Sequence, residues 1–471
     1  PWNFPIAIPI GGVLASLAAG KRVILKPSTN AAASAYLTAQ CLWRAGIPKS
    51  VFAFLPAEES SLDAFLSEGN TFDAVILTGG TSTAKFLLDR NPQLNLYAET
   101  GGKNSTIVSS LSDRDQAIKN VVQSAFGNSG QKCSATSLLI LEKEVFNDPH
   151  FKQLLKDATQ SKVHGNPWNL ETEIGPLAVE MSDKIKECIE STPKYQWLLE
   201  PKVDGKFLVS PGIKWGINEE DFEYNNELFG PILSVMEAKD LQDAIRIANG
   251  VEYGLTTGLE SLDKREVAYW KNNIQAGNLY VNRSTTGAIV QRQPFGGVKA
   301  SCFGFGMKAG GANYILQFAN LKIKDSTNYL KSYQSSWDDH FSREIDYAHI
   351  RGQYNKNRYT KPEQIILITD KFTSVDDVSM VRAAAEIIDV PIRQTDNLES
   401  VISDLSHDTV VRSLIGDRID ETFLKECHFR AIHVYDRKPN PSGRMELLNY
   451  LNEQNFSYNF HRYGNLLGEE S

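Results

Sequence analysis

The stretch "FDAVILTGGTSTAKFLLDRNPQLNLYAETGG" (residues 72–102) decides the fold. It holds an apolar run, a Gly-Gly pair, a segment of helical character and a second apolar run. The helical segment is expected to stop at Pro92, because proline cannot continue a helix. Two strands joined by a crossover helix run parallel to each other. The stretch therefore predicts an α/β protein with a parallel, doubly wound sheet.

The alternation of strands and helices continues on both sides of this stretch. Upstream, we expect a strand in "KRVILKPS", a helix in "NAAASAYLTAQCLWRAG", a strand in "VFAFLPA" and a helix in "SLDAFLSEG". Residues 104–310 continue as mixed α/β with longer insertions. We expect the chain to leave the main α/β body in the polar and aromatic stretch "FANLKIKDSTNYLKSYQSSWDDHFSRE". From about residue 361 a small α/β unit follows, with strands in "QIILITD", "TVVRSLIG" and "RAIHVYD" around a helix in "SVDDVSMVRAAAEIID".

The bulk composition excludes several classes of protein. The formal net charge of the 471 residues is −8, which does not favour a nucleic-acid or acidic-membrane partner. The five cysteines form no CxxC pair and the eight histidines no HExxH motif, so we expect no disulfide framework, no metal site and a reducing, cytoplasmic compartment. No apolar run reaches the roughly 18 residues of a membrane helix. The chain starts with Pro1 in what looks like a structured turn, so we expect a fragment of a longer polypeptide.

One cysteine stands out by its setting, in "AFGNSGQKCSATSLLILEK" (residues 125–143). A helix with an apolar stripe precedes it, with Ser112 or Asp113 as the expected N-cap, and the buried strand "SLLILE" follows it. Cys133 thus lies on a short irregular segment between two packed elements, where reactive groups are often placed. The alternative is that Cys133 is a small buried apolar residue.

Three more features carry chemistry with an alternative beside each. The turn at Gly79 and Gly80 directs backbone N–H groups and a helix N-terminus outward and suits a phosphate, or it is only a tight turn. Glu99 ends a strand before a Gly-Gly pair and suits a general base, or it is a solvated carboxylate. Asn3 lies between prolines and suits an oxyanion donor, or it only satisfies its own turn.

Taken together, these residues resemble the aldehyde dehydrogenase superfamily. The motifs "PWNFP", "ETGGKN" and "GNSGQKCS" are followed in order by "IGPL", "NELFGPIL", "EYGLTTGL", "AGNLYVNR" and "QPFGG". The resemblance covers residues 1 to about 325. "GAIV" before "QPFGG" and "KAGG" after it resemble the branch that oxidises L-glutamate γ-semialdehyde, the open form of 1-pyrroline-5-carboxylate. The tail, with "HIRGQYNKNRY" and "EQNFSYNFHRYGNLLGE", is similar to that of bifunctional proline utilisation proteins. The chain therefore resembles the dehydrogenase half of such a protein, or a single-function relative with the same tail.

The resemblance implies a Rossmann-type cofactor domain, an α/β catalytic domain and a small C-terminal α/β extension. We assign residues 1–98 to an N-terminally incomplete NAD-binding domain and residues 99–310 to the catalytic domain. Residues 311–345 would form an oligomerisation strand and linker, and residues 346–471 the C-terminal domain. The family also implies a homo-oligomer, expected to be a dimer. The resemblance to bifunctional proteins is compatible with a proline dehydrogenase domain fused upstream, and the sequence leaves this open. Without the family's N-terminal section, the chain alone is expected to fold poorly, because a strand of the cofactor sheet would be missing.

The resemblance also implies a role for each matching residue. Cys133 would be the nucleophile, Glu99 the base that activates water, and Asn3 an oxyanion donor together with the Cys133 N–H. NAD would be bound by a set of residues spread along the chain: Trp2, Lys26, Thr78, Gly79, Gly80, Glu227 and Phe229. The aldehyde channel and the substrate carboxylate would be served by Phe4, Ser134, Gly310 and Gly311. No metal is implied.

The sequence departs from the family pattern in two informative places. Thr29 stands where the family often has a glutamate that binds the ribose hydroxyls, which predicts some use of NADP. "SCFGFGMKAGG" is bulkier than the usual "SGTGPKAGG", so Phe303 and Phe305 are expected to narrow or reshape the substrate loop. Three alternatives stay open: a catalytically inactive assembly module, which is the favoured reading for residues 346–471, a dehydrogenase for another semialdehyde, and a CoA-acylating dehydrogenase, against which Glu99 counts.

Overall fold

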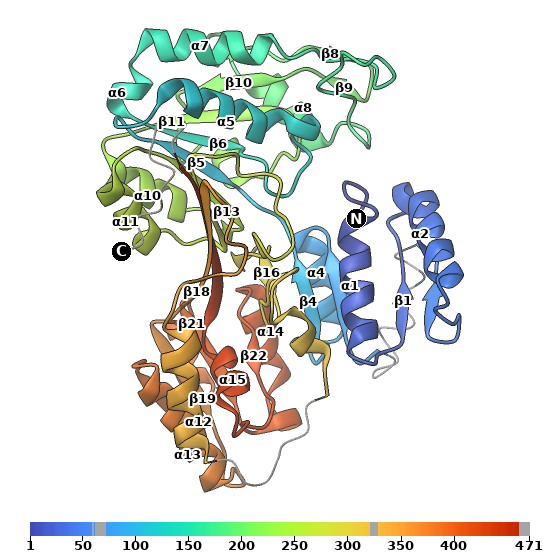
Figure 1. The fold of residues 1–471 in the computed structure, drawn as a ribbon, viewed down its shortest axis with the longest axis vertical. Coiled ribbons are helices and arrows are strands. Elements are labelled where there is room, and N and C mark those ends of the chain that lie inside the picture. The colour runs from blue at the N-terminus through green and yellow to red at the C-terminus, as the bar shows by residue number, and fades with distance from the viewer. Residues whose placement is uncertain (59–60, 62–71, 321–327, 461–471) are drawn as a thin grey trace. The chain divides into compact units, whose positions relative to one another are not determined.

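The computed structural model describes residues 1–58, 61, 72–320 and 328–460 (Figure 1). Contacts divide the chain into two compact units, each assembled from several segments. The first unit contains residues 1–100, 294–345 and 356–454, and the second contains residues 101–293, 346–355 and the described residues from 455 onward. Most of the C-terminal extension therefore belongs to the same unit as the first hundred residues.

The second unit is built around a largely parallel sheet. The strand order is β17-β18-β23-β14-β13-β5-β6-β11-β10-β7. The strands are β5 (Ser105–Val108), β6 (Leu138–Glu142), β7 (Trp197–Leu199), β10 (Gly212–Trp215), β11 (Ile232–Ala238), β13 (Thr256–Glu260), β14 (Asn278–Val281), β17 (Ile345–Asp346), β18 (Gln353–Thr360) and β23 (Asn452–Asn459). Of β18 and β23, residues 353–355 and 455–459 belong to this unit. The pairs from β23–β14 through β11–β10 are parallel, and β10–β7 is antiparallel. This confirms the predicted α/β class.

Both faces of this sheet are covered by helices, as Figure 1 shows. Leu139 and Leu141 of β6 pack with α5 (Arg114–Phe126) and α7 (Pro149–Gln160). Leu138 and Ile140 point to the other face, toward α10 (Leu241–Asn249) and α11 (Lys264–Asn273). Successive side chains of a strand alternate between faces, so a strand buried on both sides must be apolar throughout. That explains the continuous run "LLIL".

The N-terminal part of the first unit contains the βαβ element that the opening stretch predicts. β3 (Val75–Thr78) and β4 (Leu96–Glu99) are parallel, and α4 (Thr81–Arg90) connects them and ends before Pro92. β16 (Cys302–Phe303) completes a three-stranded sheet in the order β16-β4-β3. β1 (Val23–Leu25) and β2 (Phe52–Phe54) form a separate parallel pair around α2 (Ala32–Arg44). The helix expected in "SLDAFLSEG" lies outside the described residues, apart from Ser61.

The C-terminal part of the first unit is a second small α/β layer structure. Its sheet has the order β20 (Ile392–Thr395), β19 (Gln364–Ile368), β21 (Thr409–Ser413), β22 (Val434–Tyr435). Ile365 and Leu367 pack with α12 (Tyr329–Ser336) and α13 (Val375–Ile387). Ile366 and Ile368 pack on the other face with α14 (Glu421–Phe429). The strands and the helix α13 predicted for this region are confirmed.

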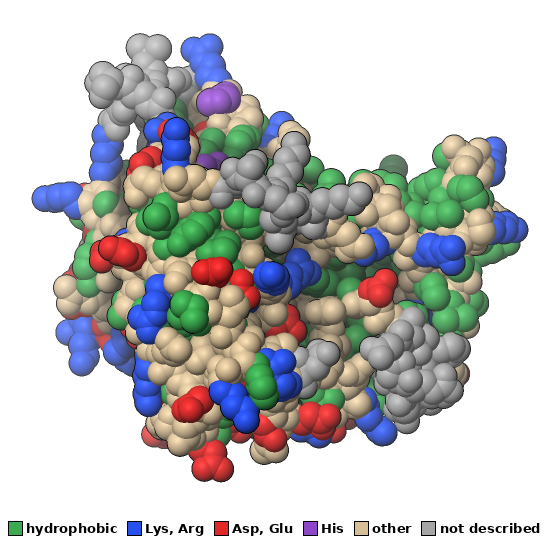
Figure 2. Space-filling model, turned by 90° about the horizontal axis from the view of Figure 1, so that it is seen from below, with side chains coloured by type: hydrophobic (Ala, Val, Ile, Leu, Met, Phe, Trp, Pro, Cys, Tyr) green, Lys and Arg blue, Asp and Glu red, His purple; other side chains and the backbone are tan. Residues whose placement is uncertain are grey.

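The surface carries charges of both signs. On the face drawn in Figure 2, positive and negative side chains are interspersed, with small groups of hydrophobic side chains between them. No helix in the described parts of the chain is both long enough and apolar enough to cross a bilayer.

Candidate active site

The segment that carries Cys133 is an irregular turn between α5 and β6. Asp113 is the N-cap of α5 and accepts a hydrogen bond from the Gln116 amide, as one of the two expected caps. After α5, Asn128, Ser129 and Gly130 all have left-handed backbones, with φ of 57°, 55° and 68°. A Cβ on Gly130 would lie 2.2 Å from the Gly230 carbonyl oxygen, so only glycine can occupy this position. The turn redirects the chain before Cys133 and prevents α5 from continuing.

Hydrogen bonds from neighbouring strands fix the Cys133 turn. The Asn104 side-chain amide donates to the carbonyl oxygens of Cys133 (2.6 Å) and Ala135 (3.0 Å). The Ser134 carbonyl accepts from the Thr285 hydroxyl at 2.9 Å, and Ser134 itself is buried. Cys133 is only partly buried. The nucleophile candidate is therefore accessible on a backbone that is held in place, and Asn104 is a positioning residue that sequence reasoning missed, although it belongs to the "ETGGKN" motif.

Glu227 and Phe229 lie in the same unit as Cys133. The Gly102 amide donates to Glu227 Oε1 at 3.0 Å, and a Cβ on Gly101 would lie 2.7 Å from Glu227 Oε2. Burial raises the pKa of Glu227 to about 7, against the opposing effects of the Gly102 hydrogen bond and of Lys103. Phe229 has a left-handed backbone with φ of 54°. Such strain at a bulky residue is concentrated at functional sites.

Lys103 is a buried cation that sequence reasoning did not single out. Its side chain is 4% exposed, and its Nζ has no hydrogen-bond partner among the residues that the structure describes. Burial lowers the pKa of Lys103 to about 8, against the opposing charges of Glu223, Cys188 and Glu227. Burial also raises the pKa of the Cys188 thiol to about 12, which makes Cys188 a poor nucleophile.

Glu99 ends β4 in the first unit, with Thr78 on one neighbouring strand and Cys302 on the other. Its Oε2 accepts a hydrogen bond from the Gly297 amide at 2.9 Å. Burial raises the pKa of Glu99 to about 7, although the Lys308 charge and the Gly297 hydrogen bond oppose this rise. A carboxylate that titrates near neutral pH is suited to general-base chemistry, because it is both ionised and basic at that pH.

Lys308 opens the "KAGG" segment and contributes to the surroundings of Glu99. The Lys308 ammonium donates to the carbonyl oxygens of Gly296 and, at 3.2 Å, Gly297. Gly310 has a left-handed φ of 76°, and the Gly311 amide donates to the Lys308 carbonyl at 3.0 Å. The Gly311 N–H is thus used within the turn.

The residues predicted to bind NAD in the first unit surround the N-terminus of α4 and the end of β1. Gly79 and Gly80 are exposed, and Gly80 caps α4 without a side-chain hydrogen bond. The Gly79 amide donates to the Glu99 carbonyl at 3.2 Å, so part of the predicted anion site is used within the sheet. Lys26 follows β1 and Thr29 is exposed nearby at the start of a short 3-10 helix. Because no side chain caps α4, the backbone N–H groups at its N-terminus suit a pyrophosphate.

The segment of Trp2, Asn3 and Phe4 is irregular, and all three residues are half-buried. A helix that we did not expect, α1 (Ala7–Ala18), follows it directly. Pro9 lies in the first turn of α1, where a missing N–H costs no hydrogen bond, so this proline is compatible with a helix.

The two bulky residues of "SCFGFG" pack into the interior of the first unit. Phe303 is buried with α4 and β4, and Phe305 is buried against Tyr97 and Tyr435, with ring centroids 6.2 and 5.0 Å away. The Arg437 guanidinium lies over the Phe305 ring at 4.2 Å from its centroid. Both phenylalanine side chains are thus buried within this unit, and Phe305 joins Tyr97 of its N-terminal layer to Tyr435 of its C-terminal layer.

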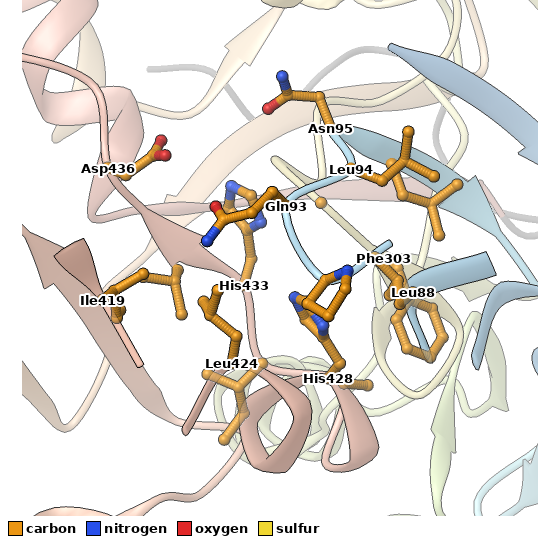
Figure 3. A pocket seen from close by; sticks show the side chains of 16 residues that line it. Leu88, Gln93, Leu94, Asn95, Phe303, Ile419, Leu424, His428, His433 and Asp436 are labelled. Atoms are coloured by element: carbon orange, nitrogen blue, oxygen red, sulfur yellow. The ribbon is translucent and has the colours of Figure 1, made fainter. Parts of the chain in front are cut away.

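The cavity of Figure 3 is distinct from the predicted site. Its volume is about 40 Å³, and its wall includes Leu88, Gln93, Phe303, His428 and His433. None of the predicted catalytic, cofactor or substrate residues is among those that line it. Within the described ranges, no three His, Cys, Asp or Glu side chains are arranged to hold a metal ion.

The predicted residues thus fall into two sets. Cys133, Ser134, Glu227 and Phe229 lie in the second unit, and the others lie in the first. Within the first unit the structure brings together Thr78, Glu99 and the "KAGG" segment. Within the second it brings Glu227 to the Gly-Gly pair that follows Glu99 in sequence.

Comparison with known proteins identifies the family. The model of the aldehyde dehydrogenase family matches residues 1–324. 1-Pyrroline-5-carboxylate dehydrogenases from Oceanobacillus iheyensis and Staphylococcus aureus are 33% and 35% identical over 335 and 338 residues. Each match covers 69% of this chain, and the chain spans only 64% of the length of these relatives.

Solved structures agree with the sequence matches. Proline utilization A from Corynebacterium freiburgense superposes with a TM-score of 0.89 at 34% identity, over 98% of this chain and 49% of that chain. 1-Pyrroline-5-carboxylate dehydrogenase from Thermus with bound NAD superposes with a TM-score of 0.63 at 30% identity, over 68% of this chain and 64% of that chain. With the family model and two relatives above 30% identity covering more than two thirds of it, this chain belongs to the aldehyde dehydrogenase family.

Proposed function

We propose that this chain catalyses the NAD-dependent oxidation of L-glutamate γ-semialdehyde to L-glutamate. The observation that carries the proposal is Glu99, a buried carboxylate with a pKa raised to about 7, in a family member whose relatives are named 1-pyrroline-5-carboxylate dehydrogenase. An inactive assembly module would have no use for a buried carboxylate with a pKa near 7 at the end of β4. A base that activates water works best with such a pKa.

The proposed chemistry runs through a covalent thioester. The Cys133 thiolate bonds to the aldehyde carbon, and the Asn3 amide with the Cys133 N–H stabilises the oxyanion. A bound NAD would supply the acceptor for the hydride of this carbon, which leaves a thioester on Cys133. Glu99 then takes a proton from water as the water oxygen bonds to the thioester carbon. The carbon–sulfur bond breaks, the acid is released and the thiolate is restored.

The proposed cofactor contacts follow the family roles. Glu227 would hold the nicotinamide ribose, with Phe229 and Trp2 near the nicotinamide. Lys26 would hold the adenosine ribose, and the exposed turn of Thr78, Gly79 and Gly80 would hold the pyrophosphate. We propose NAD as the preferred cofactor, with measurable use of NADP because Thr29 carries no charge to repel a 2′-phosphate.

The proposed fusion partner rests on a structural neighbour. One structural neighbour is a proline utilization A protein described as bifunctional, 33% identical, of which this chain covers 33%. We propose that the chain acts as a homodimer, that it works beside a proline dehydrogenase domain in the same polypeptide, and that it is cytoplasmic, consistent with its five free cysteines. Mass spectrometry of the natural protein and its size in solution test the first two points.

The substrate is tested by kinetics on the complete protein. Glutamate semialdehyde should exceed hexanal in kcat/KM by roughly 10²-fold or more. Hexanal has no carboxylate, so the groups that would donate hydrogen bonds to the substrate carboxylate would stay unpaired. Ser134→Ala should narrow this ratio, whereas the exposed Ser161→Ala serves as the matched control. Equal kcat/KM values for the two aldehydes in the wild type would favour a dehydrogenase for another substrate.

A further inference from the structure

A carboxylate from the C-terminal extension holds both ends of the "KAGGAN" segment (residues 308–313). Glu453, in the part of β23 that belongs to the first unit, accepts the Lys308 backbone amide on Oε2 at 2.9 Å. Its Oε1 accepts a short hydrogen bond from the Asn313 side-chain amide. Lys308 is 1% exposed and Asn313 is 2% exposed, so both donors need a partner inside the protein. A single side chain thus fixes where this segment begins and where it ends.

The fixed Lys308 is connected to Glu99 through the turn of Gly296 and Gly297. The Lys308 ammonium donates to both carbonyl oxygens of this turn, and the Gly297 amide donates to Glu99 Oε2. A Cβ on Gly296 would lie 2.6 Å from Glu99 Oε1 and 3.0 Å from Lys308 Cδ. The turn is therefore enclosed between the lysine stem and the Glu99 carboxylate. A displacement of Lys308 would move this turn as well.

We call the hydrogen bonds of Glu453 with Lys308 and Asn313 the brace. At Asn313, further residues of the C-terminal extension contact the brace. Asn313 Oδ1 accepts from Arg444 of α15 (Gly443–Glu446) at 2.5 Å, and Asn313 Nδ2 also donates to the Tyr359 hydroxyl at 2.8 Å. The Tyr359 hydroxyl is 3.1 Å from His340 Nε2. Burial raises the pKa of Glu453, whereas the hydrogen bonds from Asn313 and Lys308 and the positive charges of Lys308 and Arg444 oppose this rise.

We propose that Glu453 is a positioning residue for the base: by holding both ends of residues 308–313, it keeps the Lys308 ammonium and the Gly297 amide in place around the Glu99 carboxylate. The inference rests on the proposed function in taking Glu99 as the base. It gives the C-terminal extension a role in hydrolysis, beyond a role in assembly, although no residue of the extension is proposed to touch the substrate.

The expected direction follows from the charges around Glu99. Burial raises the pKa of Glu99, whereas Lys308 and Gly297 lower it. The other titratable groups that face Glu99 are Cys302 and Tyr314, whose own pKa values are raised by burial and which are neutral near pH 7. Loosening the brace removes the two effects that favour ionisation. The Glu99 pKa should therefore rise, and the water-activating form should appear only at higher pH.

The test follows the pH dependence of deacylation in the complete protein with p-nitrophenyl acetate, an ester that needs neither NAD nor the semialdehyde. Glu453→Gln places an amide donor where two donors converge, and should move the midpoint of the deacylation profile upward by about half to one pH unit. Lys308→Met should move it further in the same direction. Glu363→Gln, which removes an exposed carboxylate at the edge of β19, should leave the midpoint unchanged.

A purely structural role for Glu453 would lower thermal stability and leave the midpoint in place. A midpoint within about 0.2 units of the wild type in folded Glu453→Gln would therefore overturn the proposal. If Glu453→Gln does not fold, Asn313→Ala removes one end of the brace, and an unchanged midpoint there has the same meaning. Failure of the proposed function looks different: wild-type deacylation would then persist in Glu99→Gln, whatever Glu453 does.

Discussion

Two carboxylates, one in each unit, have the same immediate surroundings and differ in the lysine beside them. Burial raises the pKa of both Glu99 and Glu227 to about 7. Glu99 accepts a hydrogen bond from the Gly297 amide at 2.9 Å, and Glu227 accepts one from the Gly102 amide at 3.0 Å. The Lys308 ammonium near Glu99 donates to two carbonyl oxygens. The Lys103 ammonium near Glu227 has no hydrogen-bond partner among the described residues.

The difference shows what fixes a buried charge. An ammonium that donates to backbone carbonyls recovers part of its lost hydration, so Lys308 can be held at one place beside its carboxylate. Burial lowers the pKa of both lysines, but Lys103 is compensated only by charge attraction, whereas Lys308 also donates hydrogen bonds. We therefore expect Lys308 to be a fixed part of the catalytic surroundings and Lys103 to be a costly residue whose charge can be lost.

The largest expected effect concerns Glu99, the first of the two carboxylates, and Cys133. Glu99→Gln should lower steady turnover by roughly 10²–10⁴-fold, because an amide cannot accept a proton from water. A burst of NADH close to one equivalent should survive, since thioester formation does not need Glu99. Stopped-flow absorbance measures both phases. Cys133→Ala should abolish both, and a steady rate near that of the wild type in either variant would contradict the assigned roles.

The wild-type pH profile sharpens the same point. With a Glu99 pKa of about 7, hydrolysis should fall about tenfold for each pH unit below 7, because the protonated acid is not a base.

Glu227→Gln should have a smaller effect of a different kind. If Glu227 binds the nicotinamide ribose, the variant should weaken NAD binding and slow the NADH burst by about 10–100-fold, because the carboxylate bonds more strongly than an amide. Deacylation of p-nitrophenyl acetate without NAD should be unchanged. Equal losses of burst and deacylation would show that the two carboxylates do not have separate tasks.

The two lysines should respond to removal with opposite signs in stability. Lys103 has a folded pKa of about 8, below its usual value, so the unfolded chain binds its proton more tightly. The free energy of unfolding thus decreases as pH falls from about 10.5 through 8, by on the order of 3 kcal/mol at pH 7. Lys103→Met should recover part of this, whereas Lys308→Met should destabilise, because two carbonyls lose their donor.

Urea unfolding at pH 7 and pH 9.5 measures this prediction. The advantage of Lys103→Met over the wild type should shrink at pH 9.5, where Lys103 is largely neutral in the folded protein. Lys119→Met, on α5, controls for loss of a lysine elsewhere. A Lys103→Met protein less stable than the wild type at pH 7 would mean that the ammonium is better compensated than its surroundings indicate.

The smallest effect concerns the cofactor. Thr29→Glu should lower the NADP to NAD ratio of kcat/KM by about tenfold, because a carboxylate repels the 2′-phosphate at close range. Thr29→Gln is the uncharged control of similar size. If the Thr29→Glu and Thr29→Gln variants have the same NADP to NAD ratio of kcat/KM, the adenosine ribose does not lie at Thr29.

The sequence predicts those features that depend on local pattern. The strands β3 and β4, the helix α4 between them and the Asp113 cap of α5 follow from apolar periodicity, proline and capping chemistry. Glu99 and Cys133 are recognisable because their flanking glycines and strands are close in sequence. Helix α1 was missed because prolines on both sides of its start also suit a turn.

The rest depends on contacts between segments that are distant in sequence. Glu453 meets Lys308 across 145 residues, and Phe305 meets Tyr435 across a comparable distance. Nothing in "KAGG" shows that the lysine points inward, and nothing in "ETGGKN" shows that Lys103 is buried without a partner. Burial of a charge is decided by the tertiary structure, since local pattern favours an exposed lysine in both places.

The separation between Lys308 and Glu453 also has a consequence for synthesis on the ribosome. At about 5–20 residues per second, translation of the 145 intervening residues takes roughly 7–30 s. During that time the nascent chain already contains Cys133, Glu99 and the whole "KAGG" segment, while the brace is still untranslated. A chain cut before residue 452 would lack Glu453 and the whole of β23, so the Lys308 amide and the Asn313 side chain would lose their carboxylate partner.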